Sequence, residues 1–213
     1  MNSRFIVLEG SEGVGKSSHI KTIENYLIDY KIDYIITREP GGTKTGEEIR
    51  KIILDKENET DELSDALLFY ASRYENYTKK ILPALNTWKT VICDRFHYST
   101  LVYQGIVGNN ATVRDLHIIF DEMYKKSIDH VIYFYTDPEE SLKRISSRPV
   151  TDKFESKGLS FLEEISEAYK NVFKKMKNIT MIDTSGDKRD TEKVLFKSLD
   201  EIFIKNDWST YTR

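Results

Sequence analysis

The stretch Phe5-Ile-Val-Leu-Glu-Gly-Ser-Glu-Gly-Val-Gly-Lys-Ser-Ser18 decides the fold of this chain. Its apolar start predicts a buried strand, and residues 10–17 match the phosphate-binding loop Gly-x-x-x-x-Gly-Lys-Ser. Glycines let the backbone N–H groups of such a loop point at a polyphosphate, and the following helix presents its positive N-terminal end. A helical stripe then follows: Ile20, Ile23, Leu27 and Tyr30. This order of strand, loop and helix predicts a site for a nucleoside triphosphate rather than a glycine-rich turn without a ligand.

Each position of the loop has an expected role. The Lys16 ammonium group would reach the β- and γ-phosphates, and the Ser17 hydroxyl would ligate Mg²⁺. The expected contacts to the ATP phosphates are Gly10, Ser11, Glu12, Gly13, Val14, Gly15, Lys16, Ser17 and Ser18.

The composition is that of an ordinary globular protein, with 213 residues, 39% hydrophobic, 31% charged and a formal net charge of −3. No linker divides the chain, so one domain over residues 1–213 is expected. The net charge gives no reason to expect a nucleic-acid partner. The only cysteine, Cys93, lies in an apolar run and is expected in the core. With no signal peptide and no apolar run of about 18 residues, we expect a cytoplasmic location and no membrane partner.

Short apolar strands alternate with helical patterns along the whole chain. Beyond the first strand, strands are expected at 34–37, 91–93, 130–135 and 179–182. Helices are expected at 45–56, 61–85, 99–105, 112–126, 138–148, 159–177 and 191–204. Such alternation predicts an α/β fold, a five-stranded parallel sheet with helices on both faces. Ligands gather beyond the carboxyl ends of the strands in such sheets.

Asp94 and Arg95 stand at one of these carboxyl ends, after the third expected strand. Beside a phosphate-binding loop, the aspartate can hold Mg²⁺ through water and the arginine can face a second phosphate. The alternative is a structural ion pair at the end of a strand.

The helix expected from Asp61 onward carries a second candidate pair. At about 100° per residue, Phe69 projects away from the apolar stripe and shares a polar face with Arg73. An aromatic ring and a guanidinium group one turn apart can stack on a base and hold a carbonyl or phosphate. Packing against a neighbouring helix explains the pair equally well. The stripe expected in the core is Leu63, Leu67, Tyr70, Ala71, Tyr74, Tyr77 and Ile81.

A lid is expected around residues 144–157. Arg144 and Arg148 lie four residues apart at the end of a helix, before a segment without strong periodicity. Phosphoryl transfer needs water excluded and its developing charge neutralised, which a closing segment with arginines would supply.

Taken together, these motifs resemble the thymidylate kinase family, specifically its bacterial type. The resemblance spans most of residues 5–155. Two segments are much more specific than the phosphate-binding loop: Thr37-Arg38-Glu39-Pro40-Gly41-Gly42 and Tyr103-Gln104-Gly105. The resemblance also includes Thr43, Leu68-Phe69-Tyr70-Ala71-Ser72-Arg73, Asp94-Arg95 and Ser99-Thr100. The resemblance implies a fold like that of nucleoside monophosphate kinases and phosphorylation of dTMP to dTDP with ATP and Mg²⁺ in the pathway to dTTP.

The resemblance also implies roles for individual residues. Phe69 would stack on thymine, Tyr103 would lie beside the deoxyribose and disfavour a 2′-hydroxyl, and Arg95 would bind the dTMP phosphate. In the bacterial type a lid arginine, here Arg148, acts in catalysis together with Lys16 and Arg95. The full set implied for dTMP is Glu12, Arg38, Pro40, Arg50, Phe69, Arg73, Arg95, Thr100, Tyr103 and Gln104, and the set implied for the metal is Ser17 and Asp94.

The chain departs from the family pattern in two places. Relatives often read Asp-Arg-x-Glu where this chain has Asp152-Lys153-Phe154-Glu155, and a lysine does not supply a bidentate phosphate clamp. The stretch Tyr133-Phe134-Tyr135-Thr136 lacks an aspartate that is common there. Members of the family that resemble this chain are homodimers, and the apolar helix faces permit that assembly.

Three other functions remain open at this stage. The same scaffold serves kinases for other nucleoside monophosphates or nucleosides. A GTP-binding switch would need an Asn-Lys-x-Asp motif, which is absent, and the Asp-x-x-Gly match at Asp183 to Gly186 comes too late in the chain. A binding module without activity would be expected to have lost one of Lys16, Ser17, Asp94 or Arg95, and all four are present.

Overall fold

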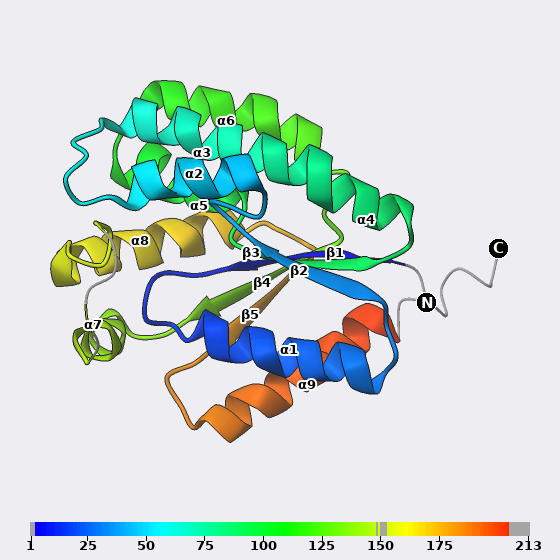
Figure 1. Ribbon diagram of the computed structural model, residues 1–213. Helices are drawn as coiled ribbons and strands as arrows, with labels where there is room; N and C mark the ends of the chain where they lie inside the picture. The colour runs from blue at the N-terminus through cyan, green and yellow to red at the C-terminus, as the bar shows by residue number, and fades with distance from the viewer. Residues whose placement is uncertain (1–2, 148, 150–152, 205–213) are drawn as a thin grey trace.

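A five-stranded parallel sheet forms the centre of the computed structural model, which describes residues 3–147, 149 and 153–204 (Figure 1). The strands are β1 (Phe5–Glu9), β2 (Tyr34–Arg38), β3 (Thr90–Asp94), β4 (His130–Tyr135) and β5 (Ile179–Asp183). Their order across the sheet is β2-β3-β1-β4-β5. The predicted α/β fold is confirmed, and each strand starts within one residue of its predicted position. Because β1 lies between β3 and β4, the loop after β1 is at the centre of the sheet edge.

Helices cover both faces of this sheet (Figure 1). On one face lie α1 (Lys16–Asp29) and α9 (Lys188–Phe203). On the other lie α2 (Lys44–Leu54), α3 (Glu62–Asn76), α4 (Leu82–Asn86), α5 (His97–Thr100), α6 (Ala111–Tyr124) and α8 (Gly158–Phe173), while α7 (Pro138–Ser146) precedes α8 at the edge of the sheet where the loop after β1 lies. No helix among the described residues is long and apolar enough to cross a membrane.

Alternating side chains of the strands build two cores. Along β1, Ile6 and Leu8 pack with the core under α1 and α9, whereas Phe5 and Val7 pack with the core on the opposite face. This is the period-two alternation of a strand buried on both sides. Cys93 is fully buried in the second core, where burial raises the pKa of its thiol, so it is a packing residue.

The predicted helical run over 61–85 is confirmed as α3, a π-helical segment at Tyr77–Ile81, and α4, which follow one another without a break. A second π-helical segment, Leu101–Val107, extends α5. The core stripe predicted for the helix from Asp61 is wrong at Leu67 and Tyr74, which are 51% and 50% exposed, and at Ala71, which is also exposed. The buried face instead includes Asp65, Ser72, Arg73 and Asn76, because polar partners from other segments meet this helix.

Candidate functional site

The phosphate-binding loop turns from β1 into α1 in close contact with its neighbours. A Cβ atom at Gly10 would lie 2.4 Å from the carbonyl oxygen of Phe134, and one at Gly13 would lie 2.5 Å from that of Ser141. Gly13 and Gly15 also have φ values of 76° and 84°, which favour glycine. No side chain among the described residues caps the N-terminus of α1, so the positive end of this helix is open to an anion.

Lys16 lies folded into this loop. Its Nζ donates hydrogen bonds to the carbonyl oxygens of Gly10 (2.7 Å) and Ser11 (2.9 Å). Burial lowers the pKa of the ammonium group to about 8, and the nearby Arg95 acts in the same direction. An anionic phosphate would offset both effects, so the loop is built to receive one.

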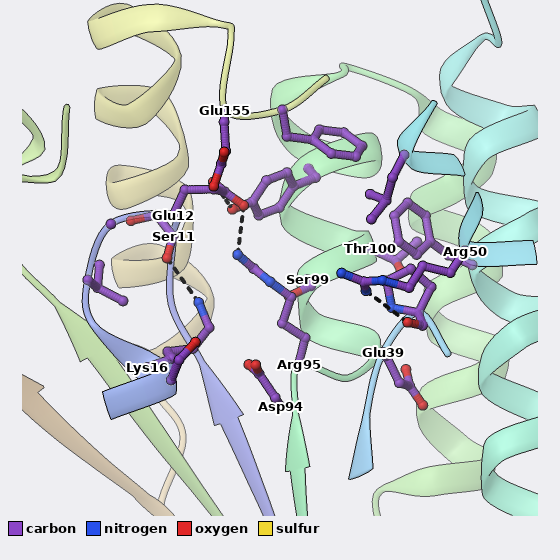
Figure 2. Close-up of a pocket in the computed structure, with 18 of the residues that line it drawn as sticks. Ser11, Glu12, Lys16, Glu39, Arg50, Asp94, Arg95, Ser99, Thr100 and Glu155 are labelled. Atoms are coloured by element: carbon purple, nitrogen blue, oxygen red, sulfur yellow. Dashed lines mark hydrogen bonds and ion pairs between the residues drawn. The ribbon is translucent and has the colours of Figure 1, made fainter. Parts of the chain in front are cut away.

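A cavity of about 470 Å³ opens in front of the loop (Figure 2). Most of the predicted site residues line it: Ser11, Glu12, Gly13, Val14, Gly15, Lys16, Ser17, Ser18, Pro40, Arg50, Phe69, Asp94, Arg95, Thr100, Tyr103 and Gln104. Three residues of the predicted lid also line it, Arg144, Phe154 and Glu155, as do three residues outside the predicted site, Glu39, Leu54 and Ser99. The predicted residues Gly10, Arg38 and Arg73 are not in its wall.

Arg95 holds the centre of this cavity. Its Nη2 donates to Glu12 Oε1 at 2.7 Å, and the hydroxyl of Tyr103 donates to Glu12 Oε2 at 2.7 Å. The guanidinium group also lies over the Tyr103 ring, 5.3 Å from its centroid. Glu12 therefore links the phosphate-binding loop to the two residues predicted to hold the second nucleotide. Figure 2 shows Lys16 and Arg95 facing the cavity from different elements, with Asp94 near both.

Glu9, which was not predicted, helps to position Arg95 through Ser99. It is fully buried and accepts hydrogen bonds from Phe96 N (3.0 Å), Ser99 Oγ (2.6 Å) and the Tyr169 hydroxyl (2.9 Å). Burial raises the pKa of its carboxyl group, against the effect of these bonds. Arg95 Nη1 in turn donates to Ser99 Oγ at 3.2 Å. Its place at the end of β1 was the only sequence signal for this role.

Ser17 and Asp94 suit a hard divalent cation. Both line the cavity, and Asp94 Oδ1 is buried without a hydrogen-bond partner among the described residues. A carboxylate and a hydroxyl oxygen are ligand types that Mg²⁺ accepts, together with water and phosphate oxygens. The donor set therefore fits the predicted metal.

Arg73 lies behind the cavity wall and is 1% exposed. Its Nε donates to Glu39 at 2.6 Å, and its Nη2 donates to the Phe96 carbonyl and to Thr100 Oγ1, both at 3.1 Å. Burial raises the pKa of Glu39 to about 7, although Arg73 opposes this shift. The contact of Arg73 with a base stays a prediction, and in this structure the residue positions Thr100.

Next to Thr100, two further predicted residues face the cavity. Gln104 is buried, and its Oε1 has no partner among the described residues. The half-buried Phe69 ring lies 6.3 Å from that of Phe154. An amide and an aromatic ring in one cavity can read the edge of a base and stack on its face.

The remaining predicted arginines have different surroundings. Arg50 donates to the Pro40 carbonyl at 2.9 Å inside the cavity. Arg38 pairs with Glu47 at 2.9 Å and lines a second hollow, which shares Ser17 and Asp94 with the cavity. Arg148 lies outside the described residues. Arg144, predicted only as part of the lid, donates to the Thr184 carbonyl at 2.8 Å and lines the cavity beside the loop.

Phe154 and Glu155 of the predicted lid close one side of the cavity. The Phe154 ring packs against Tyr103, with centroids 5.8 Å apart. Next to it, Lys153 Nζ turns away to Asp65 of α3, 2.8 Å from Oδ2, and also donates to Thr60 Oγ1 at 3.0 Å. In this structure Lys153 thus binds a carboxylate of the fold.

Comparison with known proteins gives a consistent result. The family model described as thymidylate kinase matches residues 8–194. A protein of Finegoldia magna named thymidylate kinase is 42% identical over 184 residues, covering 85% of this chain and 90% of its own. A protein of Caldicellulosiruptor saccharolyticus with the same name is 35% identical over 207 residues, covering 96% of this chain and 100% of its own. A third thymidylate kinase, from Chlamydia muridarum, is 41% identical over 170 residues, covering 78% of this chain and 82% of its own.

Proposed function

Since the chain belongs to the thymidylate kinase family, we propose that its central cavity binds ATP and dTMP together and transfers the γ-phosphoryl group directly to dTMP. The chain is a nucleoside monophosphate kinase, and its product dTDP lies on the pathway to dTTP. One observation carries the proposed site: Glu12 of the phosphate-binding loop is bonded to both Arg95 and Tyr103 across the cavity.

The loop and the start of α1 form the donor side. Backbone N–H groups at residues 13–18 would surround the β- and γ-phosphates, and the Lys16 ammonium group would exchange two carbonyl partners for phosphate oxygens. Arg144 reaches the same loop from α7, where its Nη1 lies 3.5 Å from the Gly13 carbonyl oxygen. A second cation beside the transferring group would add to the stabilisation of its charge.

The acceptor side is the wall from Phe69 to Gln104. Arg95 would bind the dTMP phosphate, Phe69 would stack on thymine, and Thr100 and Gln104 would contact its edge. Tyr103, held by Glu12, would fill the space beside the deoxyribose and leave no room for a 2′-hydroxyl. Arg50 and Pro40 would line the same side, and Arg38 and Arg73 would support it from outside the wall.

The reaction needs no general base, because the attacking phosphate oxygen of dTMP is already anionic at neutral pH. Catalysis then consists of alignment and charge neutralisation. Lys16 and the lid residue Arg148 would stabilise the transferring group, and Arg95 would hold the acceptor in line. Ser17 and Asp94 would hold Mg²⁺, which when bound neutralises phosphate charge.

We further propose the organisation that the family resemblance implies. The chain would act as one domain over residues 1–213 with a lid around 144–157, as a cytoplasmic homodimer. Exposed apolar side chains on α2, α3 and α6, which lie together on one side of the sheet (Figure 1), support the dimer: Ile52, Leu67, Tyr74, Ile118, Ile119 and Met123. Burying such side chains stabilises an interface.

An acceptor panel tests the proposal. Purified protein is incubated with ATP, Mg²⁺ and one of dTMP, dUMP, UMP, CMP, AMP, GMP or thymidine, and ADP formation is followed. A parallel reaction contains GTP and Mg²⁺ without an acceptor, and GDP formation is followed. We expect a strong preference for dTMP. Activity only with another acceptor would overturn the acceptor side and keep the kinase scaffold, whereas GTP hydrolysis without an acceptor would indicate a GTP-binding switch.

A further inference from the structure

A cluster of metal-binding side chains lies outside the cavity, between α5 and α6. His97, His117 and Asp121 each offer one ligand atom, and these atoms lie within 4.8 Å of one another. Neither the phosphate-binding loop nor any residue assigned to ATP, dTMP or Mg²⁺ belongs to the cluster. From this geometry we propose that it is a second metal site, for a divalent transition ion of the Zn²⁺ type.

The backbone sets the spacing that such a site needs. His117 and Asp121 are four residues apart on α6, so their side chains lie on one face of the helix, one turn apart. His97 opens α5 and approaches this face from the opposite side, with its ring centroid 5.1 Å from that of His117. Two ligands from one helical turn and a third from a facing element can supply three of the four ligands of a Zn²⁺ site.

The state of the donor atoms supports a ligand. His97 is 0% exposed, and both its Nδ1 and that of His117 are buried without a hydrogen-bond partner among the described residues. Leaving two such ring nitrogens unsatisfied is costly, and buried polar atoms in folded proteins are normally paired. A metal ion would take one nitrogen from each ring, which for His97 is Nε2, the atom that lies 3.0 Å from Asp121 Oδ1.

Asp121 supplies the third donor and a route of entry. Its Oδ1 lies 3.0 Å from His97 Nε2, and its side chain is 28% exposed. The carboxylate therefore connects a fully buried imidazole with the surface, which gives an ion access to the cluster. In a tetrahedral site with metal–ligand distances of about 2.0–2.2 Å, the donor atoms lie about 3.3–3.6 Å apart. The three donors here lie within 4.8 Å of one another, so an adjustment of about 1 Å would bring them to that spacing.

The ligand types select the ion. Two imidazoles and one carboxylate suit Zn²⁺, Co²⁺ or Ni²⁺, whereas Mg²⁺ prefers oxygen ligands only. The cluster should therefore not compete for the Mg²⁺ of the kinase reaction. Because His97 stands two residues after Arg95 and three before Thr100, an ion here would fix α5 to α6 directly behind the acceptor wall.

Metal binding is measured on tag-free protein without nucleotide. We expect one Co²⁺ per chain with visible d–d absorption, displaced by Zn²⁺ and not by Mg²⁺, and a Zn²⁺-dependent rise in Tm of about 5 °C at saturation. Asp121→Asn keeps a hydrogen-bond acceptor for His97 and should lower affinity at least tenfold, as should His117→Ala. His130→Ala is the matched control, since His130 contacts Thr180 at the far end of the sheet.

Each result decides the proposal. Loss of the Co²⁺ spectrum in Asp121→Asn and His117→Ala, with binding intact in His130→Ala, supports it. Absence of stoichiometric binding to the wild-type protein overturns it, as does equal binding by all variants. Thermal unfolding and ADP formation with Mg²⁺ show that the variants are folded, because none of the three residues touches the proposed substrates.

Discussion

The ion pair between Lys153 and Asp65 should hold the lid closed on the cavity. Lys153 Nζ lies 2.8 Å from Asp65 Oδ2 and 2.9 Å from Oδ1, and the two side chains are 18% and 8% exposed. Lys153 directly precedes Phe154 and Glu155, which line the cavity. Breaking the pair should therefore release one wall of the site without removing any substrate contact.

The magnitude follows from distance and burial. At 2.8 Å and an effective dielectric constant of about 20, the attraction is about 6 kcal/mol, and desolvation of both groups offsets most of it. Exposed ion pairs contribute about 0.2–1 kcal/mol to the stability of a protein. A largely buried pair whose charges are hydrated again when the lid opens should therefore stabilise the closed lid by about 1–2 kcal/mol. This corresponds to a fall in kcat/KM for dTMP of roughly 5–30-fold.

A double-mutant cycle on kcat/KM measures this coupling. Lys153→Met and Asp65→Asn should each cause the loss, and the double variant should lose little more than either. Lys143→Met is the charge-matched control, because that side chain is 81% exposed and should leave kcat/KM unchanged. If Lys153 instead bound a transferring phosphate, Lys153→Met would lower kcat by more than 100-fold and Asp65→Asn would have no effect. That result would refute the proposal that the Lys153–Asp65 ion pair holds the lid closed.

Three further predictions concern the cavity itself. Phe69→Ala should raise KM for dTMP about 5- to 100-fold with little change in kcat, since base stacking on an aromatic ring contributes about 1–3 kcal/mol; a fall in kcat alone would contradict this in steady-state kinetics. Gly13→Ala should destabilise the protein by about 1–3 kcal/mol in urea unfolding, because its Cβ would meet a carbonyl oxygen at 2.5 Å, whereas Gly186→Ala, with open space around its Cβ, should not. Above a pH of about 8 the folded protein loses the Lys16 proton, and bound phosphate restores it, so ATP affinity should fall as the pH rises. Calorimetry in buffers of different ionisation enthalpy should then show proton uptake at about pH 8.5, which Lys16→Arg abolishes; equal uptake in both proteins would contradict the assignment.

The parts of the fold that the sequence predicted are those whose structure depends on residues close together in the chain. Strands such as Phe5–Glu9 and His130–Tyr135 are continuous apolar runs, and a run of that kind is buried on both faces wherever it pairs. The phosphate-binding loop is likewise set by its own glycines. For these elements the local sequence was sufficient to predict the structure.

The signals that failed depend on distant partners. Arg73 looked like a residue of the polar face of its helix, but Glu39 and Thr100 bury it from two other segments. Leu67 and Tyr74 looked like core residues and are exposed, since periodicity identifies an apolar face and not what covers it. Glu9 was missed because its three donors come from the start of α5, from α5 itself and from α8, and no local pattern reports that convergence.

Phosphoryl transfer itself is tested most directly by following the label from [γ-³²P]ATP in the presence of Mg²⁺ and either dTMP or ribothymidine monophosphate, the ribonucleotide with the same base. The proposed cavity predicts that label appears in dTDP, that inorganic phosphate stays at background, and that the ribonucleotide is phosphorylated far more slowly because Tyr103, held by Glu12, excludes its 2′-hydroxyl. Label released as inorganic phosphate, or equal rates with both acceptors, would contradict this account of the site.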